Sequence, residues 1–260
     1  MNVILIHGFG EDHIVWNKFI GLLPRIHTYV TPDYSKLTNC ESIEEYTDWL
    51  KTLLDERKED KCVLIGHSMG GYIALTFAEK YPEMVQGLGL FHSSAYPDDE
   101  ERKATRLKTI DFIEKHGSAE FIKDFYPKMF TDEFKKANKT LIDSQIERYG
   151  SIPEKALTNA QAAMRNRKDT TAVLKEVRYP TMIIAGEEDK FVSVSAAEEQ
   201  IKLLKMGYSG VLSGVAHAGM FERPEECAKI ITGFLTACAE VQARYGGNEE
   251  EPATEKTPEL

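Results

Sequence analysis

The sequence lacks the patterns that mark disulfide-bonded, metal-binding and membrane-spanning proteins. Its four cysteines have neither C-x-x-C nor paired spacing, and its seven histidines form no H-E-x-x-H motif and no Cys/His cluster. The opening residues, MNVILIHGFG, contain no basic stretch, and their apolar run is far shorter than a signal peptide or a membrane span requires. We therefore expect reduced thiols, no metal ion and a cytoplasmic location.

Positive charge is also scarce. Lys plus Arg number 32 against 42 Asp plus Glu, and the formal net charge of -10 has the wrong sign for neutralising phosphates. Nucleic acids and anionic membrane surfaces are therefore not expected as partners. Residues 246–260 hold five Glu and one Lys with little apolar content, and we expect residues 241–260 to form a disordered acidic tail.

What the sequence does contain is an alternation of short apolar runs with amphipathic segments, which predicts an α/β protein with a doubly wound, mostly parallel sheet. The predicted strands cover residues 2–6, 26–30, 62–66, 85–91, 181–185 and 209–213. The predicted helices between and after them cover residues 15–23, 42–58, 68–80, 194–205 and 224–240. A capping box at Ser42–Glu45 and Pro224 in a first turn support two of these helices.

One interval breaks the alternation after the fourth strand. Residues 96–167 contain no strand-like run, and their charged amphipathic segments, separated by Gly117, Gly150 and Pro153, predict consecutive helices. These helices are expected at residues 98–115, 118–129, 131–149 and 153–166. The prediction is therefore a core made of residues 1–95 and 168–240, with residues 96–167 inserted as a helical lid.

The hexapeptide GHSMGG, residues 66–71, follows a predicted strand and precedes a predicted helix. A G-x-S-x-G sequence at such a sharp turn holds the serine in a strained conformation and projects its hydroxyl from the carboxyl edge of the sheet. Ser68 is therefore a candidate nucleophile. No dinucleotide fingerprint is present, so no organic cofactor is expected.

A serine hydroxyl needs a neighbouring base to become a nucleophile, and the base in turn needs an acid to orient it. His217 and Asp189 both lie in loops after predicted strands, where the carboxyl ends of parallel strands face one crevice. The order Ser68, Asp189, His217 is the one expected for such a sheet. The other histidines lie in less suitable positions, whereas several carboxylates remain alternatives for the acid: Glu187, Glu188, Asp33 and Asp98.

Four segments together resemble the α/β-hydrolase fold superfamily, in its lidded, esterase-like branch. They are HGFG at residues 7–10, GHSMGG at 66–71, GEED at 186–189 and HAGMFERPEE at 217–226. The resemblance extends to about residue 240. It implies that the Phe9 and Met69 N–H groups form an oxyanion hole and that the Phe9 side chain contacts substrate. Met220, just after His217, is a further candidate for substrate binding.

The expected function is a serine hydrolase that cleaves a small carboxylic ester or lactone through an acyl-enzyme, with Ser68, His217 and Asp189 as a catalytic triad. Two alternatives use the same residues: hydrolysis of a carbon–carbon bond and cofactor-free peroxidation. A non-hydrolytic receptor for a small ligand is a third. Aspartate is the nucleophile of the haloalkane dehalogenase and epoxide hydrolase branches, so Ser68 argues against both.

Overall fold

The computed structural model describes residues 1–245. At its centre is a six-stranded, wholly parallel sheet in the order β2-β1-β3-β4-β5-β6, which confirms the predicted fold class. The strands are β1 (Asn2–Ile6), β2 (Thr28–Val30), β3 (Cys62–His67), β4 (Val85–Phe91), β5 (Thr181–Gly186) and β6 (Gly207–Leu212).

The central strands form because their apolar runs are buried on both faces. Every residue of β3 and β5 is buried, as expected for parallel strands covered by helices on both sides. Strand β2 is shorter than predicted at its start, because residues before Thr28 form a turn in which the His27 N–H donates to the Pro24 carbonyl, and Ile26 is 83% exposed. Strand β6 begins earlier than predicted, with Gly207 opposite Thr181.

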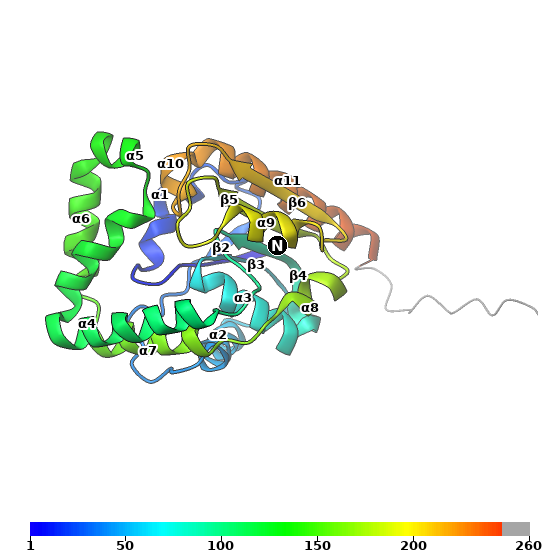
Figure 1. Cartoon of the computed structure of the whole chain (residues 1–260). Helices are drawn as coiled ribbons and strands as arrows, with labels where there is room; N and C mark the ends of the chain where they lie inside the picture. The colour runs from blue at the N-terminus through cyan, green and yellow to red at the C-terminus, as the bar shows by residue number, and fades with distance from the viewer. Residues whose placement is uncertain (246–260) are drawn as a thin grey trace, which may run out of the picture.

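Helices cover both faces of the sheet, with α11 on one side and α2 and α3 on the other (Figure 1). The predicted capping box is confirmed at the start of α2, where Ser42 and Glu45 cap each other's backbone. The helices outside the insertion are η1 (His13–Trp16), α1 (Asn17–Ile20), α2 (Ile43–Glu56), α3 (Met69–Lys80), η2 (Pro82–Met84), α8 (Thr171–Glu176), α9 (Val194–Ile201), α10 (Gly219–Glu222) and α11 (Pro224–Tyr245).

Several helix boundaries differ from the prediction. The segment predicted as one helix over residues 15–23 is a 3-10 turn followed by a short α-helix, because Asp12 caps the chain early by accepting from the Ile14 N–H. Helices α8 and α10 were not predicted. Helix α11 continues to Tyr245, beyond the expected end at residue 240, and the remainder of the predicted acidic tail, residues 246–260, lies outside the described residues.

The insertion between β4 and β5 consists of helices, as predicted, and they gather at one end of the molecule (Figure 1). Its first two predicted helices are joined into α4, which bends at Gly117, where φ is 82°. The predicted helix over 131–149 is divided at Asn138. The insertion contains α4 (Glu100–Phe125), η3 (Tyr126–Met129), α5 (Asp132–Ala137), α6 (Lys139–Tyr149) and α7 (Glu154–Asn166).

The two stems of this lid are tied together at the point where they leave the core. Asp98, on the outgoing stem, is buried and forms ion pairs with Arg106 of α4 and with Arg167 on the returning stem, the latter at 2.7 Å between Oδ1 and the guanidinium. Arg167 also donates to the Tyr96 carbonyl. These contacts hold the two stems of the insertion together.

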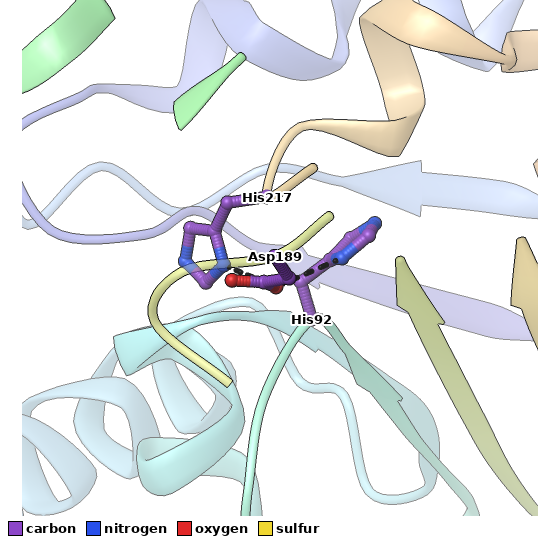
Figure 2. Close-up of side chains that lie close together, drawn as sticks. All are labelled: His92, Asp189 and His217. Carbon is purple, nitrogen blue, oxygen red and sulfur yellow. Dashed lines mark hydrogen bonds and ion pairs between the residues drawn. The ribbon is translucent and has the colours of Figure 1, made fainter. Parts of the chain in front are cut away.

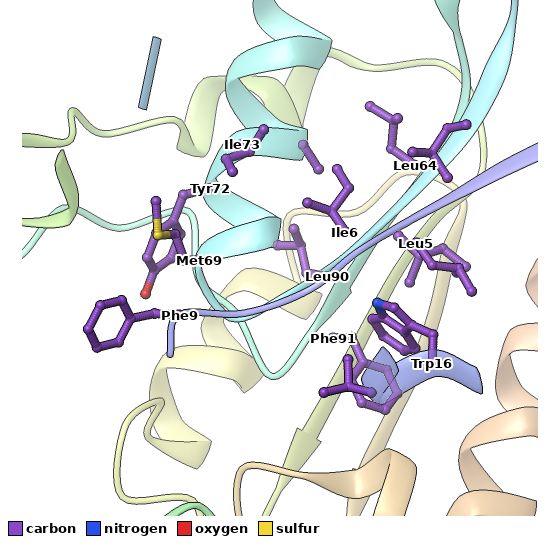
Figure 3. Close-up of a cluster of buried hydrophobic side chains, with 14 of the residues drawn as sticks. Leu5, Ile6, Phe9, Trp16, Leu64, Met69, Tyr72, Ile73, Leu90 and Phe91 are labelled. Carbon is purple, nitrogen blue, oxygen red and sulfur yellow. The ribbon is translucent and has the colours of Figure 1, made fainter. Parts of the chain in front are cut away.

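The strand order reverses between β1 and β3, and in open parallel sheets ligands bind at the carboxyl ends of the strands beside such a reversal. Apolar side chains pack beneath this edge, with Trp16 against Phe91 on one side of the sheet and Met69, Tyr72 and Phe9 on the other (Figure 3). The four cysteines are buried and unbridged. Among residues 1–245, no helix combines the length and apolar character needed to cross a bilayer.

Candidate active site

Ser68 lies at the turn between β3 and α3, at the carboxyl edge of the sheet. Its backbone has φ 51° and ψ -117°, a strained conformation for a residue with a side chain. The turn is tight enough that a Cβ at Gly66 would lie 2.2 Å from the Gly70 carbonyl oxygen. The Ser68 N–H donates to the Phe91 carbonyl, and the Ser93 hydroxyl donates to the Ser68 carbonyl. The strained turn is therefore held by the neighbouring strand β4.

The structure brings together the three side chains predicted from separate loops. The Ser68 hydroxyl donates to His217 Nε2 across 2.9 Å, and His217 Nδ1–H donates to Asp189 Oδ2 across 2.7 Å. His217 is 3% exposed, and its backbone N–H donates to the Met129 carbonyl in the lid. This geometry lets the imidazole accept the Ser68 proton while the carboxylate fixes the ring's tautomer.

Asp189 lies in the loop after β5, and both of its carboxylate oxygens are engaged. Oδ1 accepts from the backbone N–H groups of Phe191 and Val192, at 2.7 and 3.0 Å. Burial alone would raise the pKa of Asp189, but the adjacent His217 ring and the hydrogen bonds outweigh burial and hold the pKa well below its usual range. Asp189 is therefore ionised across the physiological pH range.

The alternative carboxylates lie elsewhere. Glu187 and Glu188 are exposed. Asp33 contacts the rings of His7 and His13, and Asp98 is committed to the arginines at the base of the lid. Asp189 is the candidate carboxylate that contacts His217 Nδ1.

A second histidine, which sequence reasoning set aside, also contacts Asp189. Figure 2 shows the Asp189 carboxylate between the His217 and His92 rings. The Gly219 N–H donates to His92 Nε2, so that nitrogen carries no proton, and Nδ1–H donates to Asp189 Oδ2 across 3.3 Å. Burial lowers the pKa of His92 to about 4, although Asp189 opposes this effect. The one available signal was the position of His92 directly after β4.

A buried ion pair lies beside Ser68 and connects three loops of the site. His67 Nδ1–H donates to Glu11 Oε1 across 2.5 Å, and His67 Nε2–H donates to the His217 carbonyl across 2.8 Å. Because both partners are acceptors, both ring nitrogens carry protons and His67 is an imidazolium. Glu11 Oε1 also accepts from the Gly8 N–H across 2.7 Å.

The pKa shifts of this pair follow from its burial and its charges. Burial favours the neutral form of each group, but the attraction between them outweighs it, so the pKa of His67 is raised and the pKa of Glu11 is lowered. Both side chains are fully buried. The pair therefore fixes the loop after β1 and the backbone of His217 relative to the turn at Ser68.

The two backbone amides expected to form an oxyanion hole lie at the ends of neighbouring strands. Phe9 is in the loop after β1, and Met69 is the first residue of α3, where a helical N–H has no partner within the helix. Close approach of the β1 loop requires glycine, since a Cβ at Gly8 would lie 2.7 Å from Glu11 Oε1 and 2.8 Å from His67 Nδ1.

Aromatic side chains from the lid and from the Asp189 loop cover the site. The Phe9 ring contacts Phe121 and Phe125 of α4, with centroids 5.8 and 5.4 Å apart. Phe125 also contacts Phe191, whose ring lies 4.8 Å from that of His217. Met220, in α10, is buried. The surroundings of the reacting groups are therefore apolar on the lid side.

One carboxylate ties the lid to the loop that carries His217. Glu222 of α10 is buried; its Oε1 accepts from the Thr131 N–H across 2.7 Å and its Oε2 accepts from the Ala216 N–H across 2.8 Å. Because Ala216 precedes His217, this link holds the imidazole loop against the lid.

A metal ion would need ligands that the network already uses for hydrogen bonds. Among residues 1–245, the side chains close enough to share a cation are His92, Asp189 and His217, whose ligand atoms lie within 4.8 Å of one another. Both imidazole Nδ1–H groups donate to the same Asp189 oxygen. The arrangement is that of a hydrogen-bonded network around one carboxylate.

Comparison with known proteins places the chain in a family. Residues 3–230 match the Alpha/beta hydrolase family. The chain belongs to that family. It is 24% identical to 3-oxoadipate enol-lactonase 1 of Acinetobacter baylyi. The match covers 90% of this alpha/beta hydrolase and 88% of the relative.

Two further comparisons support the same placement. The pimeloyl-[acyl-carrier protein] methyl ester esterase of Wigglesworthia glossinidia brevipalpis is 25% identical, over 90% of this chain and 93% of the relative. Among solved structures, an esterase from Thermogutta terrifontis, crystallised with malate bound, superposes with a TM-score of 0.85 and 24% identity, over 92% of this alpha/beta hydrolase and 90% of the esterase. These curated relatives are hydrolases of the same fold.

Proposed function

We propose that this protein is a serine hydrolase that cleaves a small carboxylic ester or lactone through an acyl-enzyme. The observation that carries the proposal is the continuous series of hydrogen bonds from Ser68 Oγ through the His217 ring to Asp189. A hydroxyl is almost wholly protonated at neutral pH, and this series supplies the base that it needs. Cleavage of an acyl bond is the chemistry that such a series performs on several unrelated folds.

In the first step, Ser68 Oγ attacks the substrate carbonyl carbon while His217 Nε2 accepts the hydroxyl proton. The ionised Asp189 stabilises the imidazolium through Nδ1–H and itself stays unprotonated. The tetrahedral intermediate then collapses, the bond to the leaving oxygen breaks, and His217 returns the proton to that oxygen. A lactone opens without losing a fragment, since its leaving oxygen belongs to the same molecule.

In the second step, water attacks the acyl-enzyme while His217 accepts one of its protons. The ester bond to Ser68 breaks, Ser68 recovers its proton from His217, and the carboxylic acid leaves. During both steps the N–H groups of Phe9 and Met69 are proposed to hold the negatively charged oxygen. Loss of one such donor raises the barrier by about 3 kcal/mol in comparable enzymes.

The substrate class is inferred from the relatives and from the apolar cover of the site. One relative is an enol-lactonase and another a methyl ester esterase, so both a cyclic and an open ester are represented. The rings of Phe9, Phe125 and Phe191 surround the approach to His217. We propose that Phe9 and Met220 contact the substrate and that its group nearest the carbonyl is small and apolar.

The domain organisation proposed for this reaction is a hydrolase core, residues 1–95 and 168–240, with residues 96–167 as a lid over the site. The lid contacts both loops. The backbone N–H of His217 donates to the Met129 carbonyl. Phe125 of α4 packs against the β1 loop so closely that a Cβ at Gly10 would lie 3.2 Å from its ring. We propose that α4 moves away from the site when substrate enters.

The test combines a covalent probe with a chromogenic ester. We expect a fluorophosphonate to label the wild type at Ser68 and the wild type to hydrolyse p-nitrophenyl acetate, and we expect Ser68→Ala to abolish both. Asp189→Asn should lower kcat by orders of magnitude, because the imidazole loses its orienting anion. Glu188→Gln, an exposed carboxylate one residue earlier, is the matched control and should retain wild-type kcat.

Two results would contradict the proposal. A folded wild type that neither reacts with the probe nor hydrolyses esters, but binds a small ligand tightly, would indicate a receptor. Comparable losses in Glu188→Gln and Asp189→Asn would show that the acid was misassigned.

A further inference from the structure

One fully buried titratable ring has no role in the proposed chemistry and yet touches its acid. His92 directly follows β4, and its backbone is held at φ 49°, in a region that only a few per cent of residues other than glycine adopt, although histidine is among those found there more often. Its ring is confined on the far side by Gly219, where a Cβ would lie 2.6 Å from His92 Nε2. Such a conformation persists only where the surroundings impose it, and residues of this kind gather at functional sites.

We infer that His92 is a positioning residue that holds Asp189 in place and limits how strongly Asp189 stabilises the protonated form of His217. The catalytic part of this inference rests on the proposed function. The structural part, the protonation state of His92 and its donation to Asp189, does not.

The hydrogen bonds assign a single tautomer to His92. Its Nε2 receives the Gly219 N–H across 3.2 Å, which leaves Nδ1 as the protonated nitrogen facing Asp189. Gly219 begins α10, two residues after His217, so the same ring contacts the acid and the segment that follows the base. His92 therefore joins the loops after β4, β5 and β6.

Asp189 Oδ2 is shared by two imidazole donors. His217 Nδ1–H lies at 2.7 Å and His92 Nδ1–H at 3.3 Å, while Oδ1 is taken by two backbone N–H groups. A donor to the charged form of a carboxylate lowers its basicity. With the His92 donor removed, Asp189 attracts the proton-bearing His217 ring more strongly, so His217 stays protonated up to a higher pH and cannot act as a base there.

The other titratable groups around these rings do not supply an alternative source of such a shift. The His67 ring lies 6.2 Å from His92 and 5.1 Å from His217, and its charge is balanced by Glu11 in direct contact. The groups near the His92 and His217 rings are Asp189, His67, Glu11 and Ser68. Glu222 binds the backbone of the loop that carries His217. His92 itself stays neutral at the pH of an esterase assay, since burial lowers its pKa to about 4.

Two substitutions separate donation from space filling. His92→Phe keeps a ring of similar size but has no N–H. His92→Asn has a side-chain N–H₂ near the position of Nδ1, and asparagine tolerates a positive φ. We expect His92→Phe to move the acid limb of kcat/KM for p-nitrophenyl acetate to higher pH by about one pH unit, the size expected for one charge-assisted hydrogen bond. His92→Asn should keep the limb near its wild-type position.

A residue that only fills space would give a different result. If both variants lowered kcat while the acid limb stayed at the wild-type pH, the inference would be overturned. If the wild type and all variants failed to hydrolyse the ester, the proposed function would be wrong, and the tautomer measurement would then decide the remaining part.

That measurement uses the wild type alone and does not depend on activity or on folding of the variants. Long-range ¹H–¹⁵N correlation of the histidine rings at neutral pH should find His92 protonated at Nδ1 and unprotonated at Nε2. A His92 ring protonated at Nε2, or an imidazolium, would contradict the arrangement.

Discussion

The buried pair formed by Glu11 and His67 makes a prediction about stability that depends on pH. Glu11→Gln keeps the shape of the side chain and a carbonyl oxygen for the Gly8 N–H, but it removes the negative charge beside His67. The ring then loses the anion that keeps it doubly protonated. It can no longer donate both to residue 11 and to the His217 carbonyl, so one of two buried hydrogen bonds is lost.

The expected loss of stability is large for a single substitution. Removing one partner of a buried pair costs about 3–5 kcal/mol when the other charge stays behind. Here the ring can release its proton, so the cost falls towards that of one hydrogen bond to a charged group, about 1.5–3 kcal/mol. We therefore expect Glu11→Gln to lower the free energy of unfolding by about 3 kcal/mol, a substantial part of the roughly 5–15 kcal/mol typical of a folded domain.

The pH dependence follows from the direction of each shift. The pKa of Glu11 is lowered on folding, so its stabilisation is complete above its ordinary value of 4.5 and is lost as the pH falls through the folded value. The pKa of His67 is raised on folding, so its stabilisation is complete below its ordinary value of 6.5 and is lost as the pH rises through the folded value. The pair therefore contributes most between these two values.

Urea unfolding of the wild type and of Glu11→Gln at about pH 6 and about pH 9 measures both effects. The difference between the two proteins should be larger at the lower pH. Glu187→Gln makes the same chemical change at an exposed position and should change stability little at either pH. A loss in Glu11→Gln no larger than in this control, or one that grows towards pH 9, would refute the assignment of His67 as an imidazolium.

Two further predictions concern the strained turn and the base of the lid. Ser68→Gly should be more stable than Ser68→Ala by about 1 kcal/mol and should unfold at a higher temperature, because both lose the hydroxyl while glycine alone relieves the positive φ; equal melting temperatures would mean that the turn stores no strain. Asp98→Asn should destabilise the protein by about 3 kcal/mol, since it leaves Arg167 buried without its anion, and thermal unfolding with Glu101→Gln as the exposed control measures the loss. Burial raises the pKa of Asp98, but Arg106 and Arg167 outweigh burial and lower it below its ordinary value of 3.8. The stability that ionised Asp98 contributes should therefore be lost as the pH falls below 3.8.

The sheet and the turn at Ser68 could be predicted because both are determined by local sequence. Apolar runs such as CVLIGH have no stable alternative to a buried strand, and the glycines around Ser68 leave room for a backbone approach that no other residue permits. The edge strand β2 and the short helices were predicted less well, because few buried contacts determine where they start and end.

The surroundings of the candidate triad depended on tertiary contacts that spacing along the chain does not reveal. No motif surrounds His92 in the sequence, yet β4 pairs with β5 in the sheet, which brings the end of β4 beside the Asp189 loop. Glu11 and His67 lie 56 positions apart in the sequence and meet because β1 pairs with β3. A histidine immediately after a central strand is the signal that could have identified His92.

The clamp at Asp98 and Arg167 gives the lid a single point of departure and return. The outer helices of a segment attached in this way can be changed in length without altering the strands beneath, provided that Asp98, Arg106 and Arg167 are kept. Engineers seeking a different specificity could vary the helices between Arg106 and Arg167 while keeping the Met129 carbonyl and the Thr131 N–H, which hold the His217 loop.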